Sequence, residues 1–176
     1  MMRRGKSAKY GNSKIQVIKS GQARGFEKFD FTNKYFATEK YESDERNLQK
    51  GDILINSTGV GTAGRVTLFN LDGDYIVDSH ITILRLDTNK VLPKYVLYCL
   101  ANIGFSNIEK MATGQSGQIE LAPDTIGNIK ISVPPISVQE EIIKEIEDKE
   151  NKICQIEQTI KKLYNQQSET IEKYIN

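Results

Sequence analysis

The C-terminal stretch PPISVQEEIIKEIEDKENKICQIEQTIKKLYNQQSETIEKYIN, residues 134–176, decides how the chain is organised. Two consecutive prolines end whatever precedes them, because neither can extend a strand ladder or a helix interior. Residues 136–176 then contain neither glycine nor proline. Ser137 is a suitable N-cap, and Glu140 follows at the capping-box spacing. We therefore expect one helix from about Val138 to the end, with about 38 residues spanning roughly 55–60 Å.

An aliphatic stripe runs along this helix in alternating steps of four and three residues, which is the pattern of a coiled-coil seam. Lys149 takes one place in it, and Gln167, Thr170 and Tyr174 continue it in weaker form. The alternative is a terminal helix folded back on its own domain, but a domain of about 135 residues is roughly 30 Å across and covers only part of it. The seam leaves parallel and antiparallel pairing open, and its residues are Ile142, Ile146, Ile153, Ile156, Ile160 and Leu163.

Residues 1–135 show strand patterns interrupted by turn residues. Strands are expected at 15–19, 52–56, 65–70, 75–77, 81–86 and 126–133. Pro93 favours a helix start, helical spacing follows, and Gly104 ends the run; a short second turn is expected at 108–111 and a polar loop at 112–118. The expected fold class is α+β, with a strand-rich mixed domain at 1–135 and a long helix at 136–176.

Composition limits the kinds of protein this can be. With 38% hydrophobic and 27% charged residues the chain is typical of a soluble globular protein, and no apolar run approaches the roughly 18–20 residues of a membrane span. The basic N-terminus lacks the apolar stretch of a secretory signal, and Cys99 and Cys154 form no CxxC pair. A cytoplasmic location is therefore expected, with neither a metal site nor a disulfide framework.

Charge is distributed unevenly along the chain. The net charge is +1, so the chain does not bind DNA by bulk charge. Residues 1–28 nevertheless hold eight Lys and Arg residues and one acid, whereas residues 139–150 hold six acids and two lysines. Either this is an ordinary solvated surface or residues 1–28 supply a local basic face for nucleic acid.

No catalytic constellation stands out in the sequence. GVGTAG at residues 59–64 matches G-x-G-x-x-G, but the dinucleotide fingerprint requires a helix to start there, and the following RVTLF predicts a strand. His80 is the only histidine, so we expect it to have a structural or hydrogen-bonding role. No base-methylation or nuclease motif is present, and we expect neither a catalytic site nor a bound cofactor on this chain.

Three polar loops containing glycine, at 20–25, 57–65 and 113–118, are candidates for DNA contact. Gln and Arg can read adenine and guanine in the major groove, while hydroxyl groups and glycine N–H groups suit phosphates. Ordinary turn chemistry is the alternative for each loop. The candidate contact residues are Lys6, Lys9, Gln22, Arg24, Ser57, Thr58, Thr62, Arg65, Lys110, Gln115, Ser116 and Gln118.

Several of these segments resemble the specificity subunits of type I restriction–modification systems. KGDILI at residues 50–55 with STG at 57–59 is similar to the family's "GDIL" segment, and VIKSGQ at 17–22 has a counterpart as well. The most specific match is TGQSGQ at 113–118 with the following aliphatic residues, Val133-Pro134-Pro135 and QEEI at 139–142. In that family, this run closes a target-recognition domain and opens a conserved helix.

The resemblance implies a function that the residues alone do not. It implies a non-catalytic subunit that reads one half of a bipartite DNA target and positions two modification subunits and the restriction subunits. S-adenosylmethionine, and ATP with Mg²⁺, are expected on those partners. The chain departs from the family in having one recognition domain and one helix instead of two of each, no tryptophan, and no earlier "LGD"-like element. A natural half, a truncated cassette and an engineered piece all fit this departure.

The departure suggests that two copies pair antiparallel through their helices and read a palindrome. Two rival functions stay open. One is a coiled-coil assembly or scaffold module without DNA readout, which a loss of DNA binding on changing Arg24 or Gln115 argues against. The other is a nucleotide-binding enzyme that uses the loop at 59–64, which a failure to bind any nucleotide or S-adenosylmethionine removes.

Overall fold

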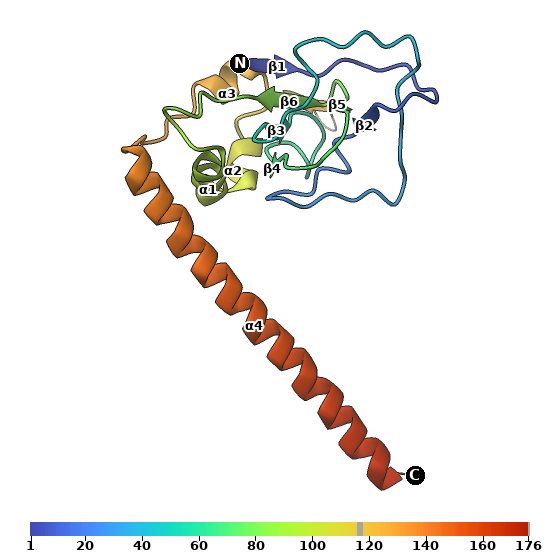
Figure 1. Cartoon of the computed structure of the whole chain (residues 1–176), viewed down its shortest axis with the longest axis vertical. Coiled ribbons are helices and arrows are strands. Elements are labelled where there is room, and N and C mark those ends of the chain that lie inside the picture. The colour runs from blue at the N-terminus through green and yellow to red at the C-terminus, as the bar shows by residue number, and fades with distance from the viewer. Residues whose placement is uncertain (116–117, 176) are drawn as a thin grey trace.

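The computed structural model describes residues 1–115 and 118–175. It has a globular part made of short strands and short helices, and one long helix, α4 (Ile136–Ile175), which extends far beyond it (Figure 1). This arrangement confirms the α+β class and the long C-terminal helix. The exact division into domains at 1–135 and 136–176 stays a prediction. None of the helices in the described part of the chain combines the length and the apolar character that a bilayer span requires.

A four-stranded antiparallel sheet forms the centre of the globular part. Its order is β1 (Met2–Arg4), β6 (Ile81–Leu84), β3 (Ile53–Asn56) and β4 (Val66–Leu68). All four residues of β3 are buried, as expected for a short apolar run in the middle of a sheet. The expected strands at 52–56, 65–70 and 81–86 are confirmed in shorter form, whereas β1 is a strand that the sequence pattern does not predict.

The strands β2 (Gln16–Ile18) and β5 (Tyr75–Val77) form a separate parallel pair. Long irregular segments surround this pair, and Phe29 and Phe31 of one segment pack against a second, mostly aliphatic core, with their ring centroids 5.5 Å apart. Both strands agree with the expected ranges. Their pairing joins segments more than fifty residues apart, which no local pattern indicates.

An ion pair inside the domain links the start of β3 to the end of β6. The Asp52 carboxylate is 1% exposed and receives two 2.7 Å hydrogen bonds from the Arg85 guanidinium, at Oδ1 and Oδ2. The backbone N–H of Gln49 donates a third hydrogen bond to Asp52. The aspartate of the GDIL segment is therefore a structural residue, which explains a polar side chain beside a buried strand.

Helix α1 (Pro93–Ile103) has the predicted bounds, with Pro93 in its first turn and Gly104 at its C-cap. Gly104 has a φ of +91°, a conformation that side chains disfavour. Helix α2 (Phe105–Glu109) follows and begins three residues before the expected turn. Gly64 lies against α2 so closely that a Cβ atom there would stand 2.5 Å from the carbonyl oxygen of Phe105, so this position requires glycine.

Two expectations for residues 112–133 are wrong. The expected polar loop at 112–118 contains β7 (Thr113–Gln115), which pairs with β8 (Gln118–Glu120) in an antiparallel hairpin. The expected strand at 126–133 is instead the short helix α3 (Pro123–Gly127) followed by irregular chain. Pro123 sits at the start of α3, where its fixed φ suits a helix, and Ile126 is buried from the helix.

Helix α4 begins at Ile136, so Ser137 lies inside the first turn and the predicted N-cap at Ser137 is wrong. The first turns pack on α1: Gln139 is fully buried, and Ile142 and Ile143 contact the main core. From residue 151 to residue 175 every side chain is exposed. The fold-back alternative therefore applies to the first turns of α4, where seam residues Ile142 and Ile146 are partly buried, whereas the seam from Ile153 onward is exposed in a single chain.

Candidate nucleic-acid interface

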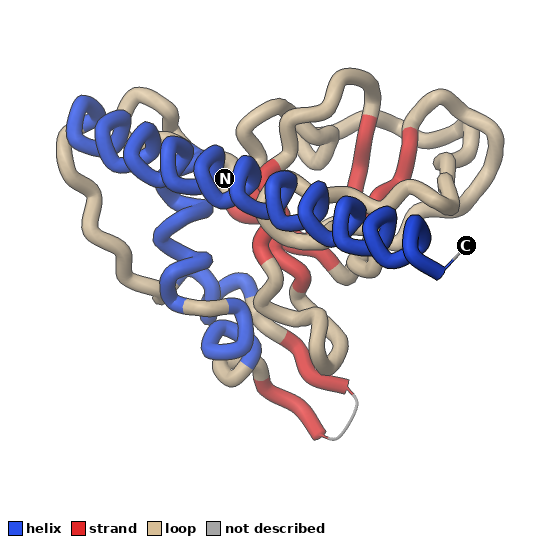
Figure 2. Tube along the Cα trace, turned by 90° about the horizontal axis from the view of Figure 1, so that it is seen from below, coloured by secondary structure: helices blue, strands red, loops and turns tan. Residues whose placement is uncertain are grey.

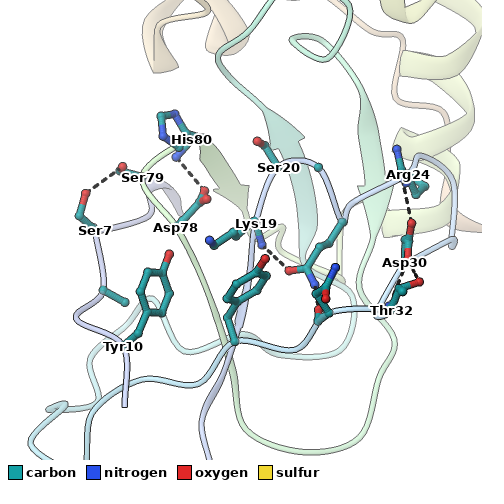
Figure 3. Close-up of a pocket in the computed structure, with 15 residues that line it drawn as sticks. Ser7, Tyr10, Lys19, Ser20, Arg24, Asp30, Thr32, Asp78, Ser79 and His80 are labelled. Atoms are coloured by element: carbon teal, nitrogen blue, oxygen red, sulfur yellow. Dashed lines mark hydrogen bonds and ion pairs between the residues drawn. The ribbon is translucent and has the colours of Figure 1, made fainter. Parts of the chain in front are cut away.

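A cavity of about 800 Å³ opens on the loops around the β2–β5 pair (Figure 3). Three segments that are distant in sequence line it. These are the chain after β1, the loop that follows β2, and the turn between β5 and β6. Loops on a rigid sheet are the usual place for binding residues, because the sheet fixes where each loop starts and ends.

Two tyrosines and a lysine form one wall of this cavity. The Lys19 ammonium lies 3.6 Å from the ring centroid of Tyr35 and 4.8 Å from that of Tyr10. The two rings lie 5.8 Å apart at an angle of 49°. A cation held over aromatic faces keeps its charge and loses little conformational freedom when it meets a phosphate. This wall therefore combines a positioned cation with flat apolar surface.

The opposite wall carries an ion pair. Arg24 lies 2.8 Å from the Asp30 carboxylate, which also accepts hydrogen bonds from the hydroxyl and backbone N–H of Thr32. The hydrogen bond from Arg24, together with those from Thr32, lowers the pKa of Asp30 to about 2. Asp30 therefore stays ionised at all ordinary pH values and holds the Arg24 guanidinium in place at the rim, with half of the arginine side chain exposed.

The turn between β5 and β6 supplies the third wall. Burial raises the pKa of Asp78, and its Oδ1 accepts a 2.9 Å hydrogen bond from the backbone N–H of His80. The His80 ring Nδ1 lies 2.7 Å from the Thr58 hydroxyl. His80 thus has the hydrogen-bonding role expected of it, and it brings the Gly-rich loop at 57–65 to the edge of the cavity.

The structure brings some of the sequence-derived candidates together. Arg24 lines the cavity, Thr58 lies at its edge through His80, and Lys6 and Lys9 line an adjoining depression with Ser7 and Ala8. Lys6 also pairs with Asp44 at 3.3 Å. Contact between these residues and DNA stays a prediction, but the structure places them around the same cavity and the depression beside it.

Two candidates are interior residues. Ser57 is fully buried and its hydroxyl bonds to the carbonyl of Ile55 and the hydroxyl of Thr82. Gln22 is 7% exposed, accepts from the N–H of Lys19 and donates to the carbonyl of Asn33. The Ser57 hydroxyl and the Gln22 amide thus make hydrogen bonds inside the fold, although Gln22 also lines the cavity, and DNA contact by either residue stays a prediction.

The remaining candidates lie on other elements. Arg65 donates to the carbonyls of Ala23 and Gly61, and the Thr62 hydroxyl donates within its own loop. Lys110 follows α2, with its ammonium 3.4 Å from Asn107. Gln115 is exposed on the hairpin, which projects from the globular part as a separate finger (Figure 2). Ser116 and the side chain of Gln118 lie outside the described residues.

Sequence reasoning missed the aromatic wall and the acids that orient the basic residues. Tyr10 and Tyr35 each directly follow a lysine in the basic N-terminal part of the sequence, and this proximity of aromatic and basic residues is the available signal. The basic character of residues 1–28 is also partly neutralised, since Arg3 pairs with Glu45 and Arg4 with Glu120.

The loop at 59–64 leads through turns into β4 and starts no helix, as expected. No cluster that could hold a metal occurs among the described residues.

Comparison with known proteins identifies the family. The family model described as "Type I restriction modification DNA specificity domain" matches residues 3–165. A putative type I restriction enzyme specificity subunit of Haemophilus influenzae, S.HindORF215P, is 33% identical over 106 residues, 60% of this chain and 26% of that protein. The putative MjaX specificity subunit of Methanocaldococcus jannaschii is 27% identical over 155 residues, 86% of this chain and 34% of that protein. The chain thus spans about a quarter to a third of these curated relatives.

Two solved structures share the fold. A chain from work on complex assembly and conformational transition of the type I R-M system has a TM-score of 0.67 at 14% identity, covering 88% of this chain and 37% of the other. The type I restriction–modification S subunit of M. genitalium has a TM-score of 0.53 at 17% identity, covering 84% and 35%. With the family model matching nearly the whole length, the chain belongs to the type I restriction modification DNA specificity domain family.

Proposed function

We propose that this chain is a DNA-reading module of a type I specificity subunit that recognises one half of a bipartite target. The observation that carries the proposal is the cavity whose walls hold Lys19, Arg24 and two tyrosine rings, in a chain of this family. Charged and amide groups on loops can reach base edges and phosphates, and the sheet holds them in register. A scaffold module without DNA readout gives these basic and aromatic side chains at the cavity no role.

The module has no catalytic part in this proposal. The relatives carry the names of specificity subunits, which agrees with the expectation of a non-catalytic role. Modification subunits with S-adenosylmethionine and restriction subunits with ATP and Mg²⁺ are the proposed partners, positioned along α4. In this proposal the chain recognises the DNA sequence, and its partner subunits catalyse modification and cleavage.

We further propose that two copies pair antiparallel through α4. From Ile153 to Leu163 the seam residues are 47–59% exposed, and exposure of such an apolar stripe to water is unfavourable. Residues 136–155 hold six acidic and three basic side chains, whereas residues 156–175 hold three of each. A parallel pair sets the two acidic halves side by side. An antiparallel pair sets each acidic half beside a neutral one, which favours the antiparallel arrangement.

Within an antiparallel pair, the sequence of the seam favours one register. If the two-fold axis passes beside Gln158, Ile153 of one copy faces Leu163 of the other, and Ile156 faces Ile160. The same register places Lys149 opposite Gln167, so the two polar seam positions meet each other. At both ends of the pair Glu145 faces Lys173, an attractive combination at flanking heptad positions. A symmetric pair of this kind reads a palindrome with two identical half-sites.

Selection from a random duplex pool, with the modification subunit encoded beside the gene, tests the reading function. A two-part palindrome with a fixed gap supports a symmetric pair of half-site readers. An asymmetric two-part site indicates a second, different half in the complex and contradicts the symmetric pair. No enrichment at low salt contradicts the reading function itself.

Cysteine cross-linking tests the pairing in a Cys154→Ser background. In the antiparallel register Ile156→Cys and Ile160→Cys form a disulfide only when the two variants are mixed. In an in-register parallel pair each variant forms a disulfide with itself, because the Cα atoms must approach within about 7 Å. A strict monomer by light scattering at micromolar concentration contradicts both arrangements.

A further inference from the structure

The globular part packs against one side of the first turns of α4, and a groove lies beside this contact. The groove has a volume of about 430 Å³ and lies between α4, helix α1 and the loop that contains Phe26. Phe26 is 41% exposed, has a φ of +55°, and packs on Phe105 with ring centroids 5.7 Å apart. The lining residues are Phe26, Glu27, Lys28, Lys94, Leu97 and Tyr98 of the globular part, and Glu150, Ile153, Cys154 and Glu157 of α4.

This side of α4 is next to the seam rather than opposite to it. The seam residues occupy heptad positions a and d, with Ile153 at a and Ile156 at d. Ile143, Glu150 and Glu157 then occupy position e, about 40° from position a at 3.6 residues per turn. Ile143 contacts the main core, Tyr98 bonds to Glu150, and Glu157 lines the groove. The globular part therefore flanks the seam along the e positions.

The far end of α4 has large apolar side chains at the same heptad position. Tyr164 and Ile171 occupy position e, outside the seam, and are 66% and 52% exposed. The e positions of coiled coils are usually charged. Apolar side chains at e positions therefore add nothing to a helix pair that is held together only by its a and d residues. In antiparallel coiled coils the e positions of the two helices face each other. In the register given above, Tyr164 of one copy faces Glu150 of the other, and Ile171 faces Ile143.

We propose that the groove between α4 and the Phe26 loop receives Tyr164 of a second copy of this chain. The inference rests on the proposed antiparallel pairing and extends it from a helix–helix contact to a contact between one helix and the partner's globular part. Tyr164 then covers the exposed faces of Phe26 and Ile153. It fixes each recognition domain to both helices of the pair.

Charge complementarity supports a second copy as the occupant. In this register the two Glu157 side chains approach each other at the two-fold axis, an unfavourable pair of like charges. Lys28 of each copy lines the same groove as Glu157, so each groove offers a cation to the Glu157 carboxylate that the second copy brings to the axis.

Cross-linking between two variants of the full chain, both in the Cys154→Ser background, tests the inference. Lys28→Cys in one copy and Tyr164→Cys in the other are expected to be joined by a short bifunctional maleimide. The matched control replaces Lys28→Cys by Lys40→Cys, an exposed lysine on a loop outside the groove, and is expected to give no product. Equal yields for Lys28 and Lys40 overturn the inference.

Dimer affinity gives a second, independent readout by sedimentation. Tyr164→Ala is expected to raise the dimer dissociation constant about tenfold or more, as removal of a buried aromatic group at an interface does. Asn165→Ala, next to it on the outer face, is expected to change the constant less than about twofold. If the mixed Ile156/Ile160 disulfide forms while Tyr164→Ala leaves the affinity unchanged, the inference falls and the pairing stands. If neither disulfide nor dimer forms, the pairing falls as well.

Discussion

The hydroxyl group of Tyr98 donates a 2.9 Å hydrogen bond to Oε2 of Glu150, and this bond joins α1 to the fourth turn of α4. One turn earlier Lys94 lies 2.8 Å from Glu147 on α4 and 3.3 Å from Glu27 on the Phe26 loop. Burial alone lowers the pKa of Lys94, but the hydrogen bond to Glu147 and the charge of Glu27 give a net increase. These contacts fix the direction in which α4 leaves the domain.

The Tyr98–Glu150 bond is expected to weaken in alkali. Burial, with the hydrogen bond to Glu150, raises the pKa of Tyr98 to about 12. The pKa of Tyr98 is therefore higher in the folded state than its value of about 10 in the unfolded state. The protonated phenol contributes fully to stability below about pH 10, and this contribution is lost as the pH rises through about 12. Tyr98→Phe removes it. The stability difference between wild type and Tyr98→Phe, measured by urea unfolding, should therefore shrink between about pH 10 and 12; a constant difference contradicts this.

Gln139 is expected to be required for the stability of the α4 junction. Its side chain accepts a 2.8 Å hydrogen bond from the N–H of Leu92 and donates to the carbonyls of Lys90 and Pro134. Gln139→Leu leaves these buried groups unpaired, at a cost of about 1–3 kcal/mol each. Chemical denaturation measures the loss. The matched control is Gln158→Leu on the exposed part of α4, where the free energy of unfolding should change by less than about 0.5 kcal/mol.

Asp52→Asn is expected to destabilise the domain by about 3–5 kcal/mol, because the Arg85 guanidinium loses its charged partner inside the fold. The hydrogen bonds from Arg85 to Asp52 raise the pKa of Arg85, so the arginine stays charged. Asp72→Asn is the control, since Asp72 pairs with Lys50 but is 91% exposed. A surface pair contributes about 0–1 kcal/mol. Similar losses in the two variants would show that burial does not strengthen the Asp52–Arg85 pair.

Lys19→Ala is expected to weaken binding to all DNA sequences alike and to reduce the slope of log affinity against log salt by about one. The reason is that Lys19 is held over Tyr10 and Tyr35 at the cavity, where we propose that its ammonium meets a phosphate. Lys130→Ala provides the comparison, with little change expected, because this exposed lysine lines neither the cavity nor the adjoining depression. Titration of a labelled duplex at several salt concentrations checks both. Equal salt slopes for wild type and Lys19→Ala would place the phosphate contacts elsewhere.

Asp30 should titrate near pH 2 in the folded protein, and its pKa should move toward the ordinary value of 3.8 in Arg24→Ala. A lowered pKa contributes stability above the unfolded value, and this contribution is lost as the pH falls through about 2. Carboxyl chemical shifts in NMR titrations measure both values. An unshifted Asp30 in the wild type means that Arg24 is not held at the rim of the cavity.

Local sequence determined the elements in which one residue dictates the backbone. Pro93 and Gly104 bound α1 correctly, because a proline without an N–H suits a first turn and a glycine tolerates a φ of +91°. The absence of Gly and Pro after residue 135, with a heptad stripe, is enough to predict α4. The residue strings that resemble type I specificity subunits, such as GDIL at 51–54, indicate the family by themselves, because they depend on residue type and order alone.

Only the tertiary structure decided which polar residues face outward. Gln22 and Arg24 lie in one polar loop and look equally suited to DNA, but the first is bonded inside the fold and the second is half exposed at the cavity rim. The sequence around Ile126 has the apolar pattern of a strand, but Ile126 lies in helix α3, which starts at Pro123, and its side chain is buried. The cavity itself joins Tyr10, Lys19 and His80 from three segments. Such proximity depends on which strands pair, and pairing depends on packing energies summed over the whole chain, which no local pattern contains.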